Sequence, residues 1–108
     1  MISCTNSAML FIQTEHVTYY ILRLCPGRDL GKEIDKFISD SERSIRAGVM
    51  VTCVGSLQEV RIRLANAQQK VSYKDKFEIV SLVGTLGIER FHLYLSVSDS
   101  AGKTIRGH

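Results

Sequence analysis

A single segment of this chain has clear helical periodicity, and this limits the folds that the chain can form. Apolar residues recur on one stripe of that segment, at Leu30, Ile34, Phe37 and Ile38. Asp29 can cap the helix, which we expect to end within the polar run 39–44. Parallel neighbouring strands each need a crossover of about a dozen residues or more, usually a helix. With one helix available, an α+β fold with a mostly antiparallel, curved sheet is expected.

Five segments have the composition or the alternation of β-strands. Residues 16–24 are rich in β-branched and aromatic residues and stop at Pro26 and Gly27. Residues 77–86 are apolar on both faces, which is typical of a central strand, and Gly84 and Gly87 mark a bend and a stop. The expected strands are residues 16–24, 47–54, 57–65, 77–86 and 91–98, with a polar loop over 66–76 and a turn at 99–102. A sheet covered by one helix on one face must protect its other face and its edges by curling, by shielding loops or by pairing with another copy of the chain. We predict self-association; the alternative is a monomer whose strands close a barrel.

Length and composition indicate one small globular domain. The 108 residues suffice for one hydrophobic core, and the formal net charge is +3. The three cysteines, Cys4, Cys25 and Cys53, form no Cys-x-x-Cys pair, and their odd number favours a reducing cytoplasm. No run of about 18–20 apolar residues is present, so no membrane contact is expected.

Two histidines could bind a divalent metal. His92 and Tyr94 point to the same side of their strand because side-chain direction repeats every two residues. If the chain doubles back after the turn, His108 returns near His92, and two imidazoles could then hold zinc or another divalent ion. The alternative is that His92 packs at a subunit interface, where Tyr94 would also have a structural role.

The basic residues allow a nucleic-acid interpretation. Arg61 and Arg63 share one strand face, and Arg46 is near them in sequence. The alternative is a solvated strand face paired with carboxylates. Glu78 lies on an otherwise apolar strand, where a structural ion pair with an arginine is expected. No catalytic residues are assigned: Ser98, His92 and Asp99 lack a nucleophile elbow, and no phosphate-binding glycine motif occurs.

Four segments in order resemble the plant and prokaryote conserved (PPC) domain. They are YILRLCPGRDLGKEIDKFI (20–38), VGSLQEVRIRLAN (54–66), KFEIVSLVGTLG (76–87) and FHLYLSVSDSAGKTIRGH (91–108). The most specific is the stretch Phe77 to Thr85. The match is partial, because the late strand has His92 and Tyr94 where relatives usually have His-x-His. Arg106, Gly107 and His108 likewise stand where Gly-Gly-His is usual.

The resemblance implies a homotrimer with a sheet packed on one helix. Residues 16–108 would form the domain, after a poorly defined segment 1–15, and the domain would lack its C-terminal strands. Plant relatives pair it with an AT-hook, which is absent here, and prokaryotic relatives are described as predicted DNA-binding proteins. The resulting prediction is a cytoplasmic, bacterial or archaeal assembly module that is nucleoid-associated if it binds DNA, with no identified catalysis. The alternative is a small-ligand or metal-binding protein with a histidine-containing cleft between subunits. An uncharacterised enzyme is included in this alternative.

Overall fold

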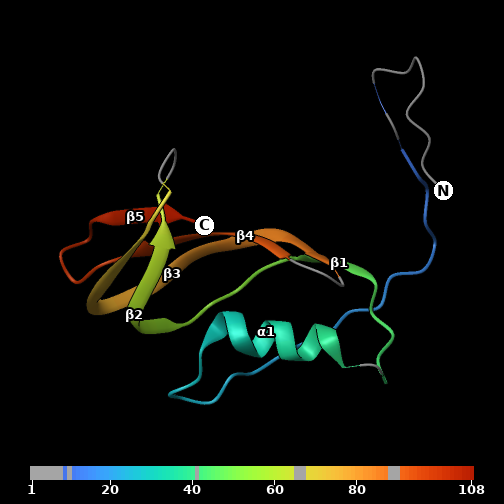
Figure 1. Ribbon diagram of the computed structural model, residues 1–108, viewed down its shortest axis with the longest axis horizontal. Helices are drawn as coiled ribbons and strands as arrows, with labels where there is room; N and C mark the ends of the chain where they lie inside the picture. Colours follow the sequence, from blue (N-terminus) through green and yellow to red (C-terminus); the bar gives the residue numbers. More distant parts are fainter. Residues whose placement is uncertain (1–8, 10, 41, 65–67, 88–90) are drawn as a thin grey trace.

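The computed structural model describes residue 9 and residues 11–40, 42–64, 68–87 and 91–108. Within them, one helix lies against one face of a five-stranded sheet (Figure 1). The elements are α1 (Leu30–Ser39), β1 (Ala47–Met50), β2 (Ser56–Arg63), β3 (Lys70–Gly87), β4 (Phe91–Ser98) and β5 (Thr104–Gly107). Every strand pairing is antiparallel, so the expected α+β architecture is confirmed. No helix in the described residues is both long and apolar enough to cross a bilayer.

The central strand is β3, and it is longer than the sequence predicts. Its first half pairs with β2 and its second half with β1, while β4 runs along its other edge. The prediction of a loop over 66–76 is wrong from Lys70 onward, since residues 70–74 form a ladder with β2. Polar residues belong in this part of the strand because one face of the two-stranded ribbon is exposed to solvent. Residues 65–67 lie outside the described part of the chain.

The helix forms where its periodicity predicts it. The Asp29 side chain accepts a hydrogen bond from the backbone N–H of Lys32 at 2.9 Å, which satisfies one of the unpaired donors of the first turn. Ile34 and Ile38 are buried with Leu82 of β3 and form one of two core clusters. The other cluster lies away from the helix and contains Val60, Ile62, Phe77 and Val97.

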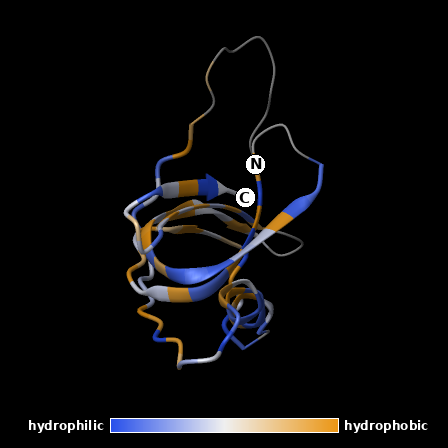
Figure 2. Cartoon of the chain, turned by 90° about the vertical axis from the view of Figure 1, so that its left-hand side faces the viewer, coloured by the Kyte–Doolittle hydropathy of each residue, from blue (hydrophilic) through white to orange (hydrophobic). Residues whose placement is uncertain are grey.

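The strands curl until β5 reaches β2. Arg63 and His108 exchange two backbone hydrogen bonds, each 3.0 Å long, as opposed residues in an antiparallel ladder do. Together with the β2–β3, β3–β4 and β4–β5 pairings, this contact closes a ring of strands around the second core cluster (Figure 2). The sequence predicts no strand at 104–107, since this short segment has little periodicity; in the structure it pairs with β4.

The strand expected over residues 16–24 does not form in this structure. The segment is extended but lies outside the sheet, and Ile21 is 99% exposed. Tyr20 of this segment packs edge-to-face on Phe37 of α1, with ring centroids 5.1 Å apart. The prediction was wrong because β-propensity describes what suits a sheet but not which strand supplies the partner.

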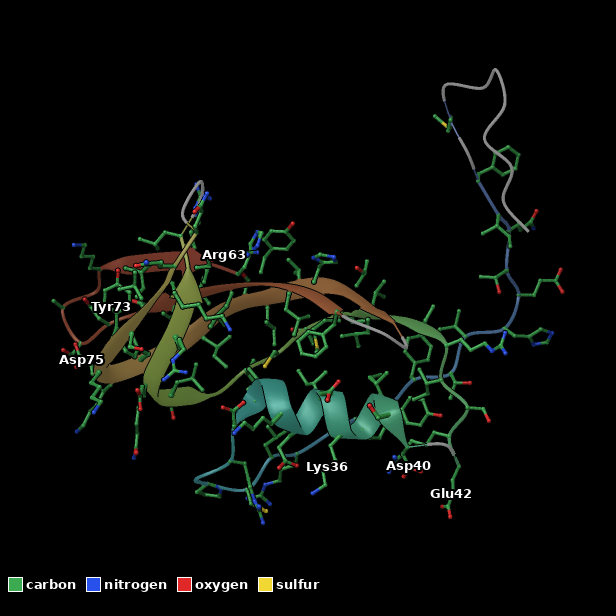
Figure 3. The ribbon with its side chains drawn as sticks, viewed as in Figure 1. Lys36, Asp40, Glu42, Arg63, Tyr73 and Asp75 are labelled. Carbon is green, nitrogen blue, oxygen red and sulfur yellow. The ribbon has the colours of Figure 1, made fainter. Side chains whose placement is uncertain are left out.

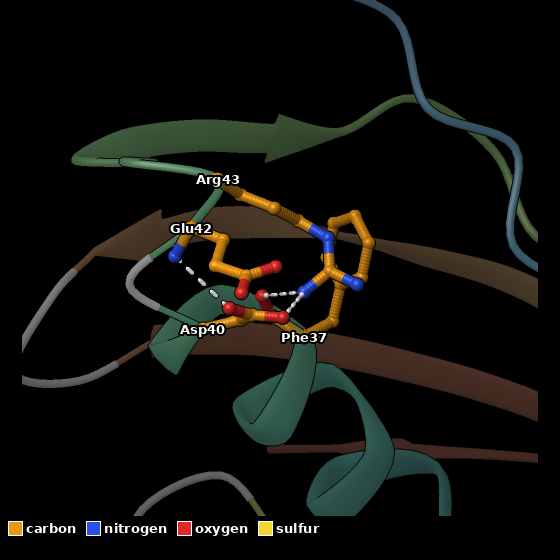
Figure 4. A network of polar contacts seen from close by, with 4 residues as sticks. All are labelled: Phe37, Asp40, Glu42 and Arg43. Atoms are coloured by element: carbon orange, nitrogen blue, oxygen red, sulfur yellow. Dashed lines mark hydrogen bonds and ion pairs between the residues drawn. The ribbon is translucent and has the colours of Figure 1, made fainter.

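Polar side chains form hydrogen bonds that stabilise the C-terminal end of α1 and the β4–β5 turn. At the end of α1, Arg43 lies over the Phe37 ring and donates hydrogen bonds to the Asp40 carboxylate and the Phe37 carbonyl oxygen (Figure 4). At the turn, the Asp99 carboxylate accepts from the backbone N–H groups of Ala101 and Lys103. This confirms the predicted turn.

A further polar contact joins β3 to the β4–β5 turn. Asp75 accepts hydrogen bonds from the Lys76 backbone N–H and the Ser100 hydroxyl. These bonds lower the pKa of the Asp75 carboxyl below its ordinary value.

Candidate nucleic-acid interface and C-terminal pocket

One face of the β2–β3 hairpin is strongly basic. On β2, Val60 and Ile62 are buried, so Glu59, Arg61 and Arg63 point to the exposed side. The register places Lys74 opposite Glu59, Ser72 opposite Arg61 and Lys70 opposite Arg63. We call these six exposed residues, Glu59, Arg61, Arg63, Lys70, Ser72 and Lys74, the basic face. It contains four cations and one carboxylate, which gives a strongly positive surface on one small ribbon.

The sequence predicted half of the cations of this face. Arg61 and Arg63 share it as the alternation predicts, whereas Lys70 and Lys74 lie in the segment predicted to be a loop. The alternation of Lys70, Ser72 and Lys74 with Val71 and Tyr73 was the signal that could have found them. Figure 3 shows Arg63, Tyr73 and Asp75 along this hairpin, away from α1.

Arg46 does not join the basic face. It directly precedes β1, whose first residue, Ala47, pairs with Gly87 at the end of β3 opposite to Lys70. The structure therefore separates Arg46 from Arg61 and Arg63 along the length of the central strand.

Glu78 differs from the expected ion-paired residue. It lies between Ser56 of β2 and Ser98 of β4 in the ladder, and its side chain is exposed. Among the described residues, the structure shows no ion pair for it. Solvation of the carboxylate removes the need for an arginine partner, because an exposed charge has little desolvation cost.

A pocket lies where β5 returns to β2 and β4. We call it the C-terminal pocket; its volume is about 330 Å³ and its lining residues are Arg63, Lys70, Phe91, His92, Leu93 and His108. Nη2 of Arg63 lies 3.1 Å from Nδ1 of His108. The His108 ring also packs edge-on against Tyr94, with centroids 4.4 Å apart. The predicted return of His108 toward His92 is therefore reproduced, since both line one pocket.

The donor set of this pocket is a poor match for zinc. A guanidinium can only donate hydrogen bonds, so Nδ1 of His108 is the acceptor and its lone pair is already engaged. Within the described residues, no three His, Cys, Asp or Glu side chains come together as a ligand group. The metal-binding role of His92 and His108 stays a prediction, and Arg63 and Lys70 beside them disfavour a cation.

The structure describes two of the three cysteines and the Asp99 side chain. Cys25 is exposed and Cys53 is half-buried, and both are free thiols; Cys4 lies outside the described residues. Burial raises the pKa of the Cys53 thiol, which makes it less reactive. The Asp99 carboxylate accepts two backbone hydrogen bonds in its turn, so it has a structural role there.

Two curated proteins are similar to this chain in sequence. Two curated relatives, both named "Bifunctional protein GlmU", come from Synechococcus sp. strain JA-3-3Ab and strain JA-2-3B'a(2-13). They are 35% identical over 97 residues and 36% identical over 89 residues, covering 90% and 82% of this chain. The chain spans only 15% and 14% of their lengths.

Two solved structures have a similar fold. A hypothetical protein from Salmonella cholerae-suis is 37% identical with a TM-score of 0.77, over 82% of this chain and 63% of the other. A Bacteroides thetaiotaomicron protein described as a "putative DNA binding protein" is 25% identical with a TM-score of 0.61, over 71% of this chain and 56% of the other. Residues 12–108 match the Plants and Prokaryotes Conserved (PCC) domain, the family whose resemblance the four sequence segments carried. The chain belongs to the Plants and Prokaryotes Conserved domain family.

Proposed function

We propose that this domain is a self-assembling module that associates with DNA through the basic face of its β2–β3 hairpin. The observation that carries the proposal is the placement of Arg61, Arg63, Lys70 and Lys74 on one exposed ribbon. The description of the Bacteroides relative is consistent with this role.

A two-stranded ribbon is a suitable shape for this task. The major groove of B-DNA admits such a ribbon, and lysine and arginine side chains along it can reach phosphates on either side. Glu59 is the one carboxylate of the face; it stands opposite Lys74 and next to Arg61 along β2. Phosphate contacts of this kind give affinity with little sequence discrimination, so we expect binding that depends strongly on salt.

Self-association as a homotrimer is the second part of the proposal. The sheet face opposite α1 carries Val49, Val83 and Tyr94, which are 66%, 49% and 49% exposed. The pairing of Val83 with Tyr94, and of Val49 with Thr85 two residues further along β3, puts all three on this face. Such a contiguous apolar surface is typical of an interface, and the PPC resemblance implies a trimer. A trimer would repeat the basic face three times and increase avidity for DNA.

The DNA proposal is tested by a salt series. Arg61→Ala/Lys74→Ala removes two cations that belong to the basic face but not to the C-terminal pocket. Fluorescence anisotropy with a labelled duplex should show about tenfold weaker binding, because each lost cation removes a phosphate contact. The slope of log K against log salt should fall in magnitude by about 2 for each protomer on the duplex.

A charge-matched control is available on the helix. Lys32→Ala/Lys36→Ala removes the same net charge from exposed positions of α1, where Figure 3 shows Lys36 pointing away from the sheet. This variant should bind DNA almost as the parent does. Equal losses in both variants, or an unchanged slope in the hairpin variant, would contradict the assignment of the basic face.

The trimer is tested by mass in solution. Light scattering after size exclusion should give three times the 12.1 kDa of one protomer. Val83→Lys places a charge on the open sheet face without touching the core, since Val83 is already half-exposed. We expect this variant to remain folded by circular dichroism and to dissociate. A monomeric parent protein at micromolar concentration would overturn the trimer.

A further inference from the structure

The C-terminal pocket has a charge distribution that suits an anion. Its described lining includes the permanent cations Arg63 and Lys70 and the imidazoles of His92 and His108, with no aspartate or glutamate side chain among them. The two apolar members, Phe91 and Leu93, are half-buried and form part of the wall. We propose that this pocket binds the phosphate or carboxylate group of a small molecule. The pocket borders the basic face and shares Arg63 and Lys70 with it, whereas its other lining residues lie outside that face.

The hydrogen-bond pattern prepares the pocket for an oxyanion. Because Arg63 donates to Nδ1 of His108, the neutral His108 ring must carry its proton on Nε2. An Nε2–H group is a donor and can bond to an oxygen of the ligand. Arg63 has five N–H donors and uses one in this contact. The guanidinium can therefore still donate two parallel hydrogen bonds to the oxygens of a bound anion.

The position of these groups is fixed by the fold. The backbone of Arg63 is bonded to that of His108 in both directions, which holds the β2 and β5 sides of the pocket together. The edge-on contact with Tyr94 further restricts the His108 ring. Such restraint lowers the entropic cost of binding. A volume of about 330 Å³ lies at the lower end of the range of small-molecule pockets, so a compact metabolite fits better than a large cofactor.

The test uses inorganic phosphate as the probe. Imidazole resonances of His92 and His108 are followed by nuclear magnetic resonance while phosphate is added to the full chain, with sodium chloride of equal ionic strength as the reference titration. We expect saturable shifts with phosphate and none with chloride. The ¹⁵N shifts should also show an unprotonated Nδ1 and a protonated Nε2 in His108 before the addition.

Variants separate this site from the proposed DNA surface. His92→Ala changes an exposed residue outside the basic face and should weaken phosphate binding about tenfold while leaving duplex binding unchanged. Arg61→Ala/Lys74→Ala should do the reverse. If DNA binding fails altogether but phosphate binding persists, the pocket stands without the DNA proposal.

Three results would overturn the inference. The first is a shift that grows linearly with phosphate or appears equally with chloride. The second is a His92→Ala variant that loses phosphate and DNA together, which would make the pocket part of the DNA interface. The third is saturable binding of zinc, reversed by a chelator, with displacement of the Arg63 contact from His108.

Discussion

Replacing Gly84 with alanine is expected to lower the free energy of unfolding by about 2–4 kcal/mol. Gly84 has φ +155°, a conformation that residues with side chains rarely adopt. An added Cβ would also overlap the carbonyl oxygen of His92 and lie 2.9 Å from Cα of Leu93. Both neighbours belong to the backbone of β4, so the two strands would have to separate at the centre of the sheet.

Comparison with Gly102→Ala separates the steric part of this cost from the conformational part. Gly102 also has a positive φ, +83°, but a Cβ there would meet no heavy atom within 4 Å. The free energy of unfolding of Gly102→Ala should therefore fall by only about 1 kcal/mol, the cost of placing alanine at a positive φ. Urea denaturation at one fixed protein concentration measures both variants, with a lower midpoint and an unchanged m value expected for each. Equal midpoints for the two would show that the β3–β4 approach at Gly84 is not limiting.

Local sequence pattern predicted those parts of the fold that local forces determine. The stripe from Leu30 to Ile38 predicted α1 because burial of one helix face is a property of the segment itself. The doubly apolar stretch 77–86 predicted the central strand for the same reason. The alternation around Arg61 and Arg63 correctly put both side chains on one exposed face.

Features that depend on distant partners escaped prediction. Residues 104–107 become β5 through pairing with β4, and residues 70–74 become strand through pairing with β2. Residues 16–24 have suitable composition but no strand beside them. The Arg63 side of the C-terminal pocket also escaped prediction, because Arg63 and His108 are 45 positions apart and meet only when the ring of strands closes. The approach of His108 to His92, by contrast, is predicted from the sequence.

Closure of that ring depends on Gly107. Its Cβ position lies 2.5 Å from the carbonyl oxygen of Arg63 and 3.2 Å from Cβ of Ile62, so a side chain cannot fit while β5 touches β2. Gly107→Ala should break the two backbone hydrogen bonds between Arg63 and His108 and lower the free energy of unfolding by about 2–3 kcal/mol. The helix and its core cluster, which lie elsewhere, should persist.

Hydrogen exchange at the amides of Arg63 and His108 measures this opening directly. Both amides should lose protection in Gly107→Ala, and phosphate binding in the C-terminal pocket should be lost with them. Gly48→Ala is the matched control, because a Cβ there would make ordinary contacts at 3.8–3.9 Å with the Leu86 side chain. Unchanged protection of both amides in Gly107→Ala would mean that the ring closes by another route, and the pocket would then need a different explanation for its shape.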